Sequence, residues 1–191
     1  MKQKLLHCLA LVLSGGLLGC STTSRQSIES RQWGPATDGL QMSLSVSMSN
    51  PVDPAFEIAI RNVGEKDISL NLGMMLANGK VQLPNKIHFS LIDGSGRKRE
   101  LHFSDPPVAG RVDDYVVPLR SGSTYTLELR LDQFWSPGTQ EFALQLKPGR
   151  NEMSAQFQGD GAEHFNTGME GMKLMNFWGE KLQSNVVVVV E

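Results

Sequence analysis

Strict alternation of apolar and polar residues is the feature that most constrains the fold of this chain. Between positions 40 and 48, every second residue is apolar and the residues between are glutamine or serine; the apolar set is Leu40, Met42, Leu44, Val46 and Met48. A period of two places successive side chains on opposite faces of an extended strand, whereas a helix needs a period of 3.6. The segment is therefore predicted to be a strand with one buried face.

The same alternation returns along the chain at short intervals, bounded by turn residues. It predicts further strands around residues 56–60, 68–72, 87–91, 101–103, 125–131 and 153–157. Short strands separated by turns are typical of an all-β fold, and we expect a single antiparallel β-sandwich. The unbroken β-branched run at 186–190 predicts a final interior strand that is buried on both faces.

The turn Asp93-Gly94-Ser95-Gly96 joins two of these strands, and the register of the hairpin follows from the pattern. The apolar residues on both sides have odd numbers and must share one face, so opposed residues sum to an even number. A three-residue loop with a glycine bulge satisfies this condition. His88 then lies opposite either His102 or Glu100. The two histidines are the best metal-ligand candidates in the chain, but two imidazoles alone make neither a structural nor a catalytic zinc site. We predict no metal and no cofactor.

A late corner of the chain carries a family resemblance. The run Leu146-Lys147-Pro148-Gly149-Arg150-Asn151 looks like the loop-to-strand corner of immunoglobulin-like sandwiches. Many such domains place a tyrosine just after the Pro-Gly turn, where its hydroxyl bonds back across the corner. Asn151 takes that place here.

Residues 56–157 resemble bacterial immunoglobulin-like domains through their turn sequences. The relevant segments are Asn62-Val63-Gly64, Ile92-Asp93-Gly94, Pro118-Leu119-Arg120-Ser121-Gly122 and Lys147-Pro148-Gly149. Domains of this layout occur in many bacterial envelope lipoproteins and in a small family of bacterial proteinase inhibitors. The resemblance implies an immunoglobulin-like β-sandwich, and its motifs concern turns rather than active-site chemistry.

The first twenty residues resemble a bacterial lipoprotein signal. Lys2 and Lys4 precede an apolar run at 5–13, which leads to Leu17-Leu18-Gly19-Cys20. About 15 residues lie between Lys4 and Cys20, too few for a spanning helix, which needs about 20. A plain secretory signal cut near residues 14–16 is the alternative. The resemblance implies removal of residues 1–19, lipid attachment at Cys20 and a membrane anchor. Since Ser21 rather than aspartate follows the cysteine, it implies an outer-membrane position facing the periplasm.

The residues after the signal set the domain boundaries and exclude several chemistries. Residues 20–32 are polar and predict a flexible tether, so the folded domain is expected at 33–191. Cys8 would leave with the signal and Cys20 would carry lipid, which excludes a cysteine nucleophile and a thiolate metal site. The formal net charge of −2 offers no basic footprint for nucleic acid. The short cluster Arg97-Lys98-Arg99 predicts a solvated hairpin.

Three long connections are candidates for a binding surface, because loops carry function more often than strands. Residues 73–86 contain Asn78-Gly79 and predict an extra hairpin. The methionines of this hairpin either pack into the core or are exposed as a binding surface. Residues 103–115 contain one arginine and three aspartates, and an ion pair fits them better than a calcium site; these residues are Asp105, Arg111, Asp113 and Asp114. Residues 159–178 carry Met169, Met172 and Met175, whose spacing predicts a short helix. Its apolar stripe would cap the sandwich or bind an apolar partner.

No sequence motif of an established enzyme class is present: the chain lacks a nucleophile elbow, a phosphate-binding glycine loop and a His-Glu-x-x-His pair. The predicted function is a non-catalytic binding or accessory module of the cell envelope, held at the membrane through Cys20, with an envelope protein as partner and no nucleic acid. One alternative is a proteinase-inhibitor-like domain. A second is a metal-dependent hydrolase, which would require His88 and His102 to meet a carboxylate.

Overall fold

The computed structural model describes residues 31–47, 54–76, 79–104, 107, 109–142, 144–162 and 175–190. The compact unit that contains them begins at Arg31, whose guanidinium lies 2.7 Å from a carboxylate oxygen of Glu57. The predicted signal, Cys20 and most of the tether lie outside the described residues, as does most of the helix predicted around Met172. The described part of the chain contains no helix that could span a membrane.

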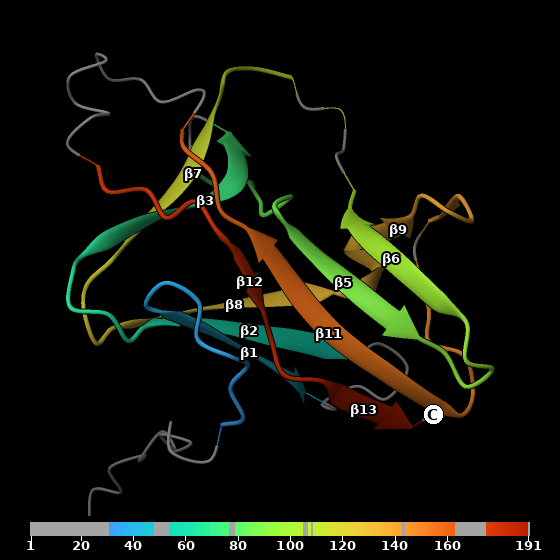
Figure 1. Cartoon of the computed structure of the whole chain (residues 1–191). Helices are drawn as coiled ribbons and strands as arrows, with labels where there is room; N and C mark the ends of the chain where they lie inside the picture. Colours follow the sequence, from blue (N-terminus) through green and yellow to red (C-terminus); the bar gives the residue numbers. More distant parts are fainter. Residues whose placement is uncertain are drawn as a thin grey trace, which may run out of the picture. The chain divides into compact units, whose positions relative to one another are not determined.

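The described strands form three antiparallel sheets (Figure 1). Sheet A has the order β1-β2-β8, sheet B the order β4-β3-β7, and sheet C the order β10-β9-β6-β5-β11-β12, with β13 also paired to β11. The strands of sheet A are β1 (Leu40–Ser47), β2 (Ala55–Asn62) and β8 (Thr124–Arg130). Those of sheet B are β3 (Ile68–Leu76), β4 (Gln82–Leu83) and β7 (Val112–Leu119). Those of sheet C are β5 (Ile87–Ile92), β6 (Lys98–Phe103), β9 (Phe134–Ser136), β10 (Glu141–Phe142), β11 (Arg150–Gln158), β12 (Lys181–Gln183) and β13 (Val187–Val190). A single turn of 3₁₀ helix, η2 (Leu131–Gln133), separates β8 from β9.

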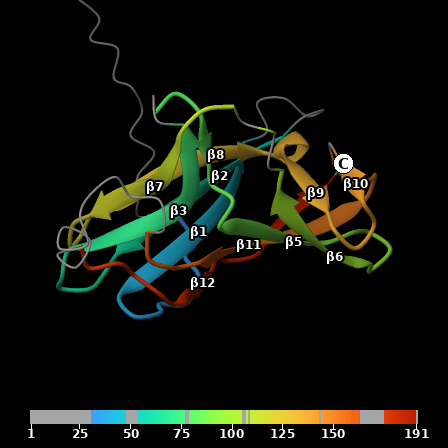
Figure 2. The same ribbon diagram turned by 90° about the horizontal axis from the view of Figure 1, so that it is seen from above.

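Backbone hydrogen bonds outside the ladders tie sheet B to sheet C. The N–H of Lys86 donates to the carbonyl of Leu72 at 3.2 Å, just before β5 begins. The N–H of Ser69 donates to Asn176, and the N–H of Trp178 donates back to Ser69, shortly before β12. In Figure 2, β3 and β7 lie beside β1 and β2, while β5, β6 and β9 lie toward the other end.

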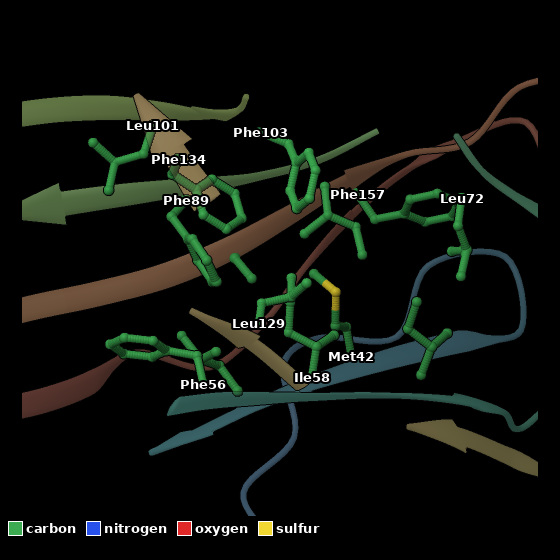
Figure 3. Close-up of a cluster of buried hydrophobic side chains, with 14 of the residues drawn as sticks. Met42, Phe56, Ile58, Leu72, Phe89, Leu101, Phe103, Leu129, Phe134 and Phe157 are labelled. Atoms are coloured by element: carbon green, nitrogen blue, oxygen red, sulfur yellow. The ribbon is translucent and has the colours of Figure 1, made fainter. Parts of the chain in front are cut away.

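The core lies between the inner faces of these sheets. Figure 3 shows Phe56 and Ile58 of β2 pointing toward Phe89 of β5, with Phe134 and Phe157 close by. All five side chains are at most 1% exposed. The rings of Phe89 and Phe134 lie 4.6 Å apart and tilted, an arrangement that suits aromatic quadrupoles. The prediction of an all-β antiparallel sandwich is confirmed.

The β5–β6 hairpin has the predicted loop. Gly94, Ser95 and Gly96 separate Asp93 from Arg97, and Gly96 has a φ of 79°, the left-handed conformation that glycine adopts without strain. The Asp93 carboxylate accepts hydrogen bonds from the N–H groups of Ser95 and Arg97, at 3.1 Å each. Its bond from the Ser95 hydroxyl, at 2.5 Å, is the main reason that the pKa of Asp93 is lowered.

The prediction for the final strand is wrong. Among the described strands β13 pairs with β11 alone, and its side chains alternate, with Val189 buried while Val188 is 45% and Val190 67% exposed. A β-branched run favours extended backbone whether one face or both are covered, so its composition does not report burial. The amide of Asn185, just before β13, bonds to both the N–H and the carbonyl of Leu44. A side chain thus joins β1 to the start of β13 as a neighbouring peptide group would.

Strand β7 lies partly in a segment that the sequence analysis assigned to a loop. Residues 112–115 of β7 fall in the predicted connection 103–115, and Pro118 and Leu119 fall in a predicted turn sequence. Proline donates no ladder hydrogen bond. In the structure, β7 pairs with β3 on one side, with Pro118 opposite Ser69, and no described strand lies on its other side. Proline is tolerated at such an edge position.

The basic cluster of the hairpin is divided between two environments. Arg97 and Lys98 are exposed, as predicted, whereas Arg99 is buried and the prediction for it is wrong. Arg99 lies opposite Leu91 on the inner side of β6, where it pairs with Glu141 at 2.7 Å and with Asp93 at 3.8 Å. Burial of a guanidinium requires such carboxylate partners.

The remaining loop predictions have mixed outcomes. The extra hairpin is confirmed by the pairing of β3 with β4, and Met75 packs against the core. Arg111 forms an ion pair with Asp113 at 2.7 Å, as predicted, while Asp105 lies outside the described residues. Asn151 substitutes for the corner tyrosine, because its fully buried amide nitrogen donates to the carbonyls of Lys147 and Gly149.

Candidate functional site

A continuous row of side chains crosses the outer face of sheet C, on the opposite side from the core. Each member lies directly opposite the next in the strand ladders, from β12 through β11, β5, β6 and β9 to β10. In that order the row is Gln183, Gln156, His88, His102, Trp135 and Phe142. We call this set the outer row.

Strand alternation produces this row without any special local structure. On β5 and β6 the buried positions are odd-numbered, so His88 and His102 point outward between inward residues such as Phe89 and Leu101. The register of the hairpin then places the two imidazoles side by side, with ring centroids 4.4 Å apart. The predicted His88–His102 register is therefore observed, and Glu100 faces Ser90 instead.

The aromatic end of the row is formed by Trp135 and Phe142. Their rings are stacked, with centroids 5.4 Å apart and planes within 7° of parallel. Phe142 lies on β10, at the edge of sheet C among the described strands, and is 67% exposed. The ring of His102 lies 6.4 Å from that of Trp135, so three aromatic systems follow one another across β6, β9 and β10.

The surroundings of the His88 imidazole favour its neutral form. Burial lowers its pKa from the ordinary value of 6.5, and the neighbouring His102 and Lys181 lower it further, while Glu100 acts in the opposite direction. The Nδ1 atom of His88 is buried and has no hydrogen-bond partner among the described residues. An unsatisfied polar atom is unusual inside a protein and is often found where a ligand or a catalytic step has use for it.

Two hollows share the imidazole pair as a common wall. The larger, of about 390 Å³, extends toward the aromatic end and is lined by Asn85, His88, His102, Phe103, Ser104, Trp135 and Phe142. The smaller, of about 260 Å³, extends toward β11 and includes Ser90, Glu100, Gln156 and Lys181. The larger hollow falls within the usual volume range of small-molecule sites, which combine apolar and aromatic walls with a few polar groups, and the smaller one lies just below that range.

A third hollow, of about 430 Å³, lies between the turn after β2 and the segment before β12. Two of the polar groups that line it take part in the fold. The Asn62 side chain donates to the carbonyls of Lys66 and Leu119, and the indole N–H of Trp178 donates to the carbonyl of Asp38.

The structure brings the two predicted histidines side by side on β5 and β6. No cluster of three His, Cys, Asp or Glu side chains capable of holding an ion occurs within the described ranges. Cys20, the predicted lipid attachment site, lies outside those ranges. Sequence reasoning missed the remaining members of the outer row. Trp135 points outward because burial alternates along residues 134–136 of β9. The turn of η2 lies between β8 and β9, so the alternation of β8 cannot be extended to predict which residues of β9 point outward.

A pair of tyrosines, one buried and one partly buried, connects sheets B and A. The hydroxyl groups of Tyr115 and Tyr125 are hydrogen-bonded to each other, joining β7 to β8. Burial, and then this hydrogen bond, raises the pKa of Tyr115 above its ordinary value of 10.0, so the group stays protonated at neutral pH.

Comparison with known proteins identifies no family. No family model matches this chain, and no curated protein matches it. A crystal structure described as the ApaA protein of Bordetella pertussis is 12% identical, covering 84% of this chain and 95% of its own, with a TM-score of 0.42. An X-ray structure of a structural-genomics target is 14% identical, covering 80% of this chain and 87% of its own, with a TM-score of 0.36. These likenesses are too distant to bear on function.

Proposed function

We propose that this chain is a lipid-anchored protein of the bacterial cell envelope whose sandwich acts by binding rather than by catalysis. The order of charged start, apolar run and Leu17-Leu18-Gly19-Cys20 supports the anchor at Cys20. In this proposal the anchor lies in the outer membrane and the sandwich faces the periplasm.

The outer row is the single observation that supports a binding role. Asn62 and Asn185 use both the oxygen and the nitrogen of their amides in hydrogen bonds to the fold. In the outer row, a large aromatic ring is mostly exposed, and beside it an imidazole nitrogen has no hydrogen-bond partner among the described residues. Aromatic side chains are enriched at recognition surfaces, and exposed apolar patches often mark them.

The proposal is tested by crosslinking the full chain in living cells and identifying captured molecules by mass spectrometry. The matched control is Cys20→Ala, which removes the lipid attachment site and leaves the sandwich unchanged. We expect the unaltered chain in the membrane fraction with a reproducible adduct, and expect both to be lost in the control. An unaltered chain that fractionates like the control would contradict the anchor. A captured protease would instead support the inhibitor-like alternative.

A further inference from the structure

We propose that the larger hollow of the outer row binds a sugar ring of a neutral glycan strand, and that Trp135 and Phe142 form its aromatic wall. The inference names the ligand of the binding role proposed above and rests on that role.

The hollow is lined by two chemically different kinds of residue. The stacked aromatic residues Trp135 and Phe142 line it together with the polar residues Asn85, Ser104 and His102. A sugar ring combines the same two kinds of surface, since its C–H groups form an apolar face and its hydroxyl groups form a polar rim. Polarised C–H groups are attracted to the electron-rich face of an aromatic ring. Amides, hydroxyls and imidazoles can both donate hydrogen bonds to the rim and accept them from it.

The walls of the larger hollow favour an uncharged ligand. None of the residues that line it is Lys, Arg, Asp or Glu. A phosphate, a nucleotide or an acidic peptide would therefore gain no charge-assisted hydrogen bond from a basic side chain here. Burial lowers the pKa of His88, which favours the neutral form of this imidazole over the cation. A polyhydroxylated ring meets these conditions and a charged ligand does not.

The length of the row favours a strand of sugars over a single one. The row crosses six strands, from β12 to β10, and neighbouring strands lie about 4.8 Å apart, so it extends about 24 Å. This length exceeds one sugar ring several times. The smaller hollow, with Gln156 in its wall, continues the row beyond the imidazole pair and can accept a neighbouring ring through amide hydrogen bonds.

The test measures retention of the purified full chain, kept in detergent, on insoluble peptidoglycan sacculi. A second arm titrates the chain with soluble chitohexaose and follows tryptophan fluorescence. The variants are Phe142→Ala and Trp135→Ala. The matched control is Val188→Ala, because Val188 is an exposed apolar residue on the outer face of the same sheet. Binding of the chain to both sacculi and chitohexaose would indicate that it recognises the sugar rings. Binding to sacculi alone would indicate that it recognises groups of peptidoglycan that chitohexaose lacks, and would contradict a site for neutral sugar rings.

We expect each aromatic variant to weaken binding about tenfold, the effect of losing roughly 1.4 kcal/mol of contact, while Val188→Ala stays within about twofold of the unaltered chain. Denaturation curves on the same preparations show whether each variant is folded, and Phe142→Ala is the more informative because this side chain is mostly exposed. Absence of binding to both ligands would overturn the proposal, as would Phe142→Ala binding like the unaltered chain. If glycan binding fails but crosslinking captures an envelope protein, the glycan is wrong and the binding role stands. If glycan binding holds but the Cys20→Ala control still fractionates with membranes, the anchor is wrong.

Discussion

The two faces of β5 and β6 are made by the same backbone but carry different kinds of side chain. The inner face presents Phe89 and Leu101, which are at most 1% exposed and belong to the core. The outer face, one residue out of phase, presents His88 and His102, which line two hollows. Strand alternation thus places core residues and hollow-lining residues on opposite faces of the same two strands. We expect substitutions on the inner face to change the stability of the fold, and, under the binding role proposed above, substitutions on the outer face to change ligand binding.

The largest expected effect is at the centre of the inner face. Phe89→Ala removes a ring that packs against Phe56 and Phe134 and leaves a cavity between the sheets. We expect the free energy of unfolding to fall by about 3–5 kcal/mol. Chemical denaturation measures this change, and a loss below that of Phe142→Ala would break the distinction between the two faces.

A polar residue of the inner face should have the next largest effect. Asn151 is fully buried on β11 and holds the corner through its bonds to Lys147 and Gly149. Asn151→Ala leaves two carbonyl groups without their donor, so we expect a loss of about 1–3 kcal/mol. The control is Asn176→Ala, because the exposed Asn176 side chain donates one bond, to the carbonyl of Asp67. Equal losses in the two variants would show that the corner bonds have no special role.

On the outer face, Phe142→Ala should cost little stability. Its ring is stacked on Trp135 but mostly exposed, so the expected loss is at most about 1.5 kcal/mol. A loss as large as that of Phe89→Ala would mean that the outer row is part of the core. Thermal unfolding of the two variants side by side provides the comparison.

The outer row should also respond to pH. The pKa of His88 is lowered in the folded protein by burial and then by His102, so between that value and the ordinary 6.5 the unfolded chain binds more protons. The contribution of neutral His88 to the free energy of unfolding is thus retained above pH 6.5 and lost as the pH falls below 6.5 toward the folded-state pKa. We expect the unaltered chain to lose more unfolding free energy than His88→Gln between pH 7.5 and pH 5. This range lies above the titration of Asp93 and Glu141, whose pKa values are also lowered. Equal losses in the two proteins would contradict a lowered pKa of His88 in the folded state.

The smallest effect is expected from an exposed ion pair of the outer face. Arg150 and Glu152 lie on the outward side of β11, with the two charged groups 2.9 Å apart. Exposed pairs of this kind contribute about 0.2–1 kcal/mol at most, and salt screens them. We expect Arg150→Ala to shift the denaturation midpoint slightly, and the shift to shrink in high salt. A large, salt-independent shift would show that Arg150 packs rather than pairs.

The inner face could be predicted from the sequence because it depends on one local rule. Odd-numbered apolar residues on β5 and β6 had to share a face, which limited the hairpin loop to an odd number of residues, and the observed three-residue loop satisfies this condition. The pairing of His88 with His102 was one of two registers left open, because nothing local chooses between His102 and Glu100. The prediction that β13 is buried on both faces was wrong for a related reason, because valine favours extended backbone whether one face or both faces are covered.

The rest of the outer row could not be predicted because it depends on long-range strand order. Gln156 and Trp135 flank the histidines only because β11 pairs with β5 and β9 pairs with β6, and no local pattern specifies these neighbours. The buried Arg99 is similar. Its carboxylate partner Glu141 lies close to it because β6, β9 and β10 pair in that order, and no local sequence pattern predicts this order.

Photo-crosslinking in living cells tests the central claim most directly, because it asks which face of the protein meets its ligand. A photoreactive residue would replace Phe142 in the outer row or, as the control, the exposed Thr126 on β8 of sheet A. The account predicts an adduct from position 142 and none from position 126. Adducts of equal yield from both positions, or from position 126 alone, would contradict it.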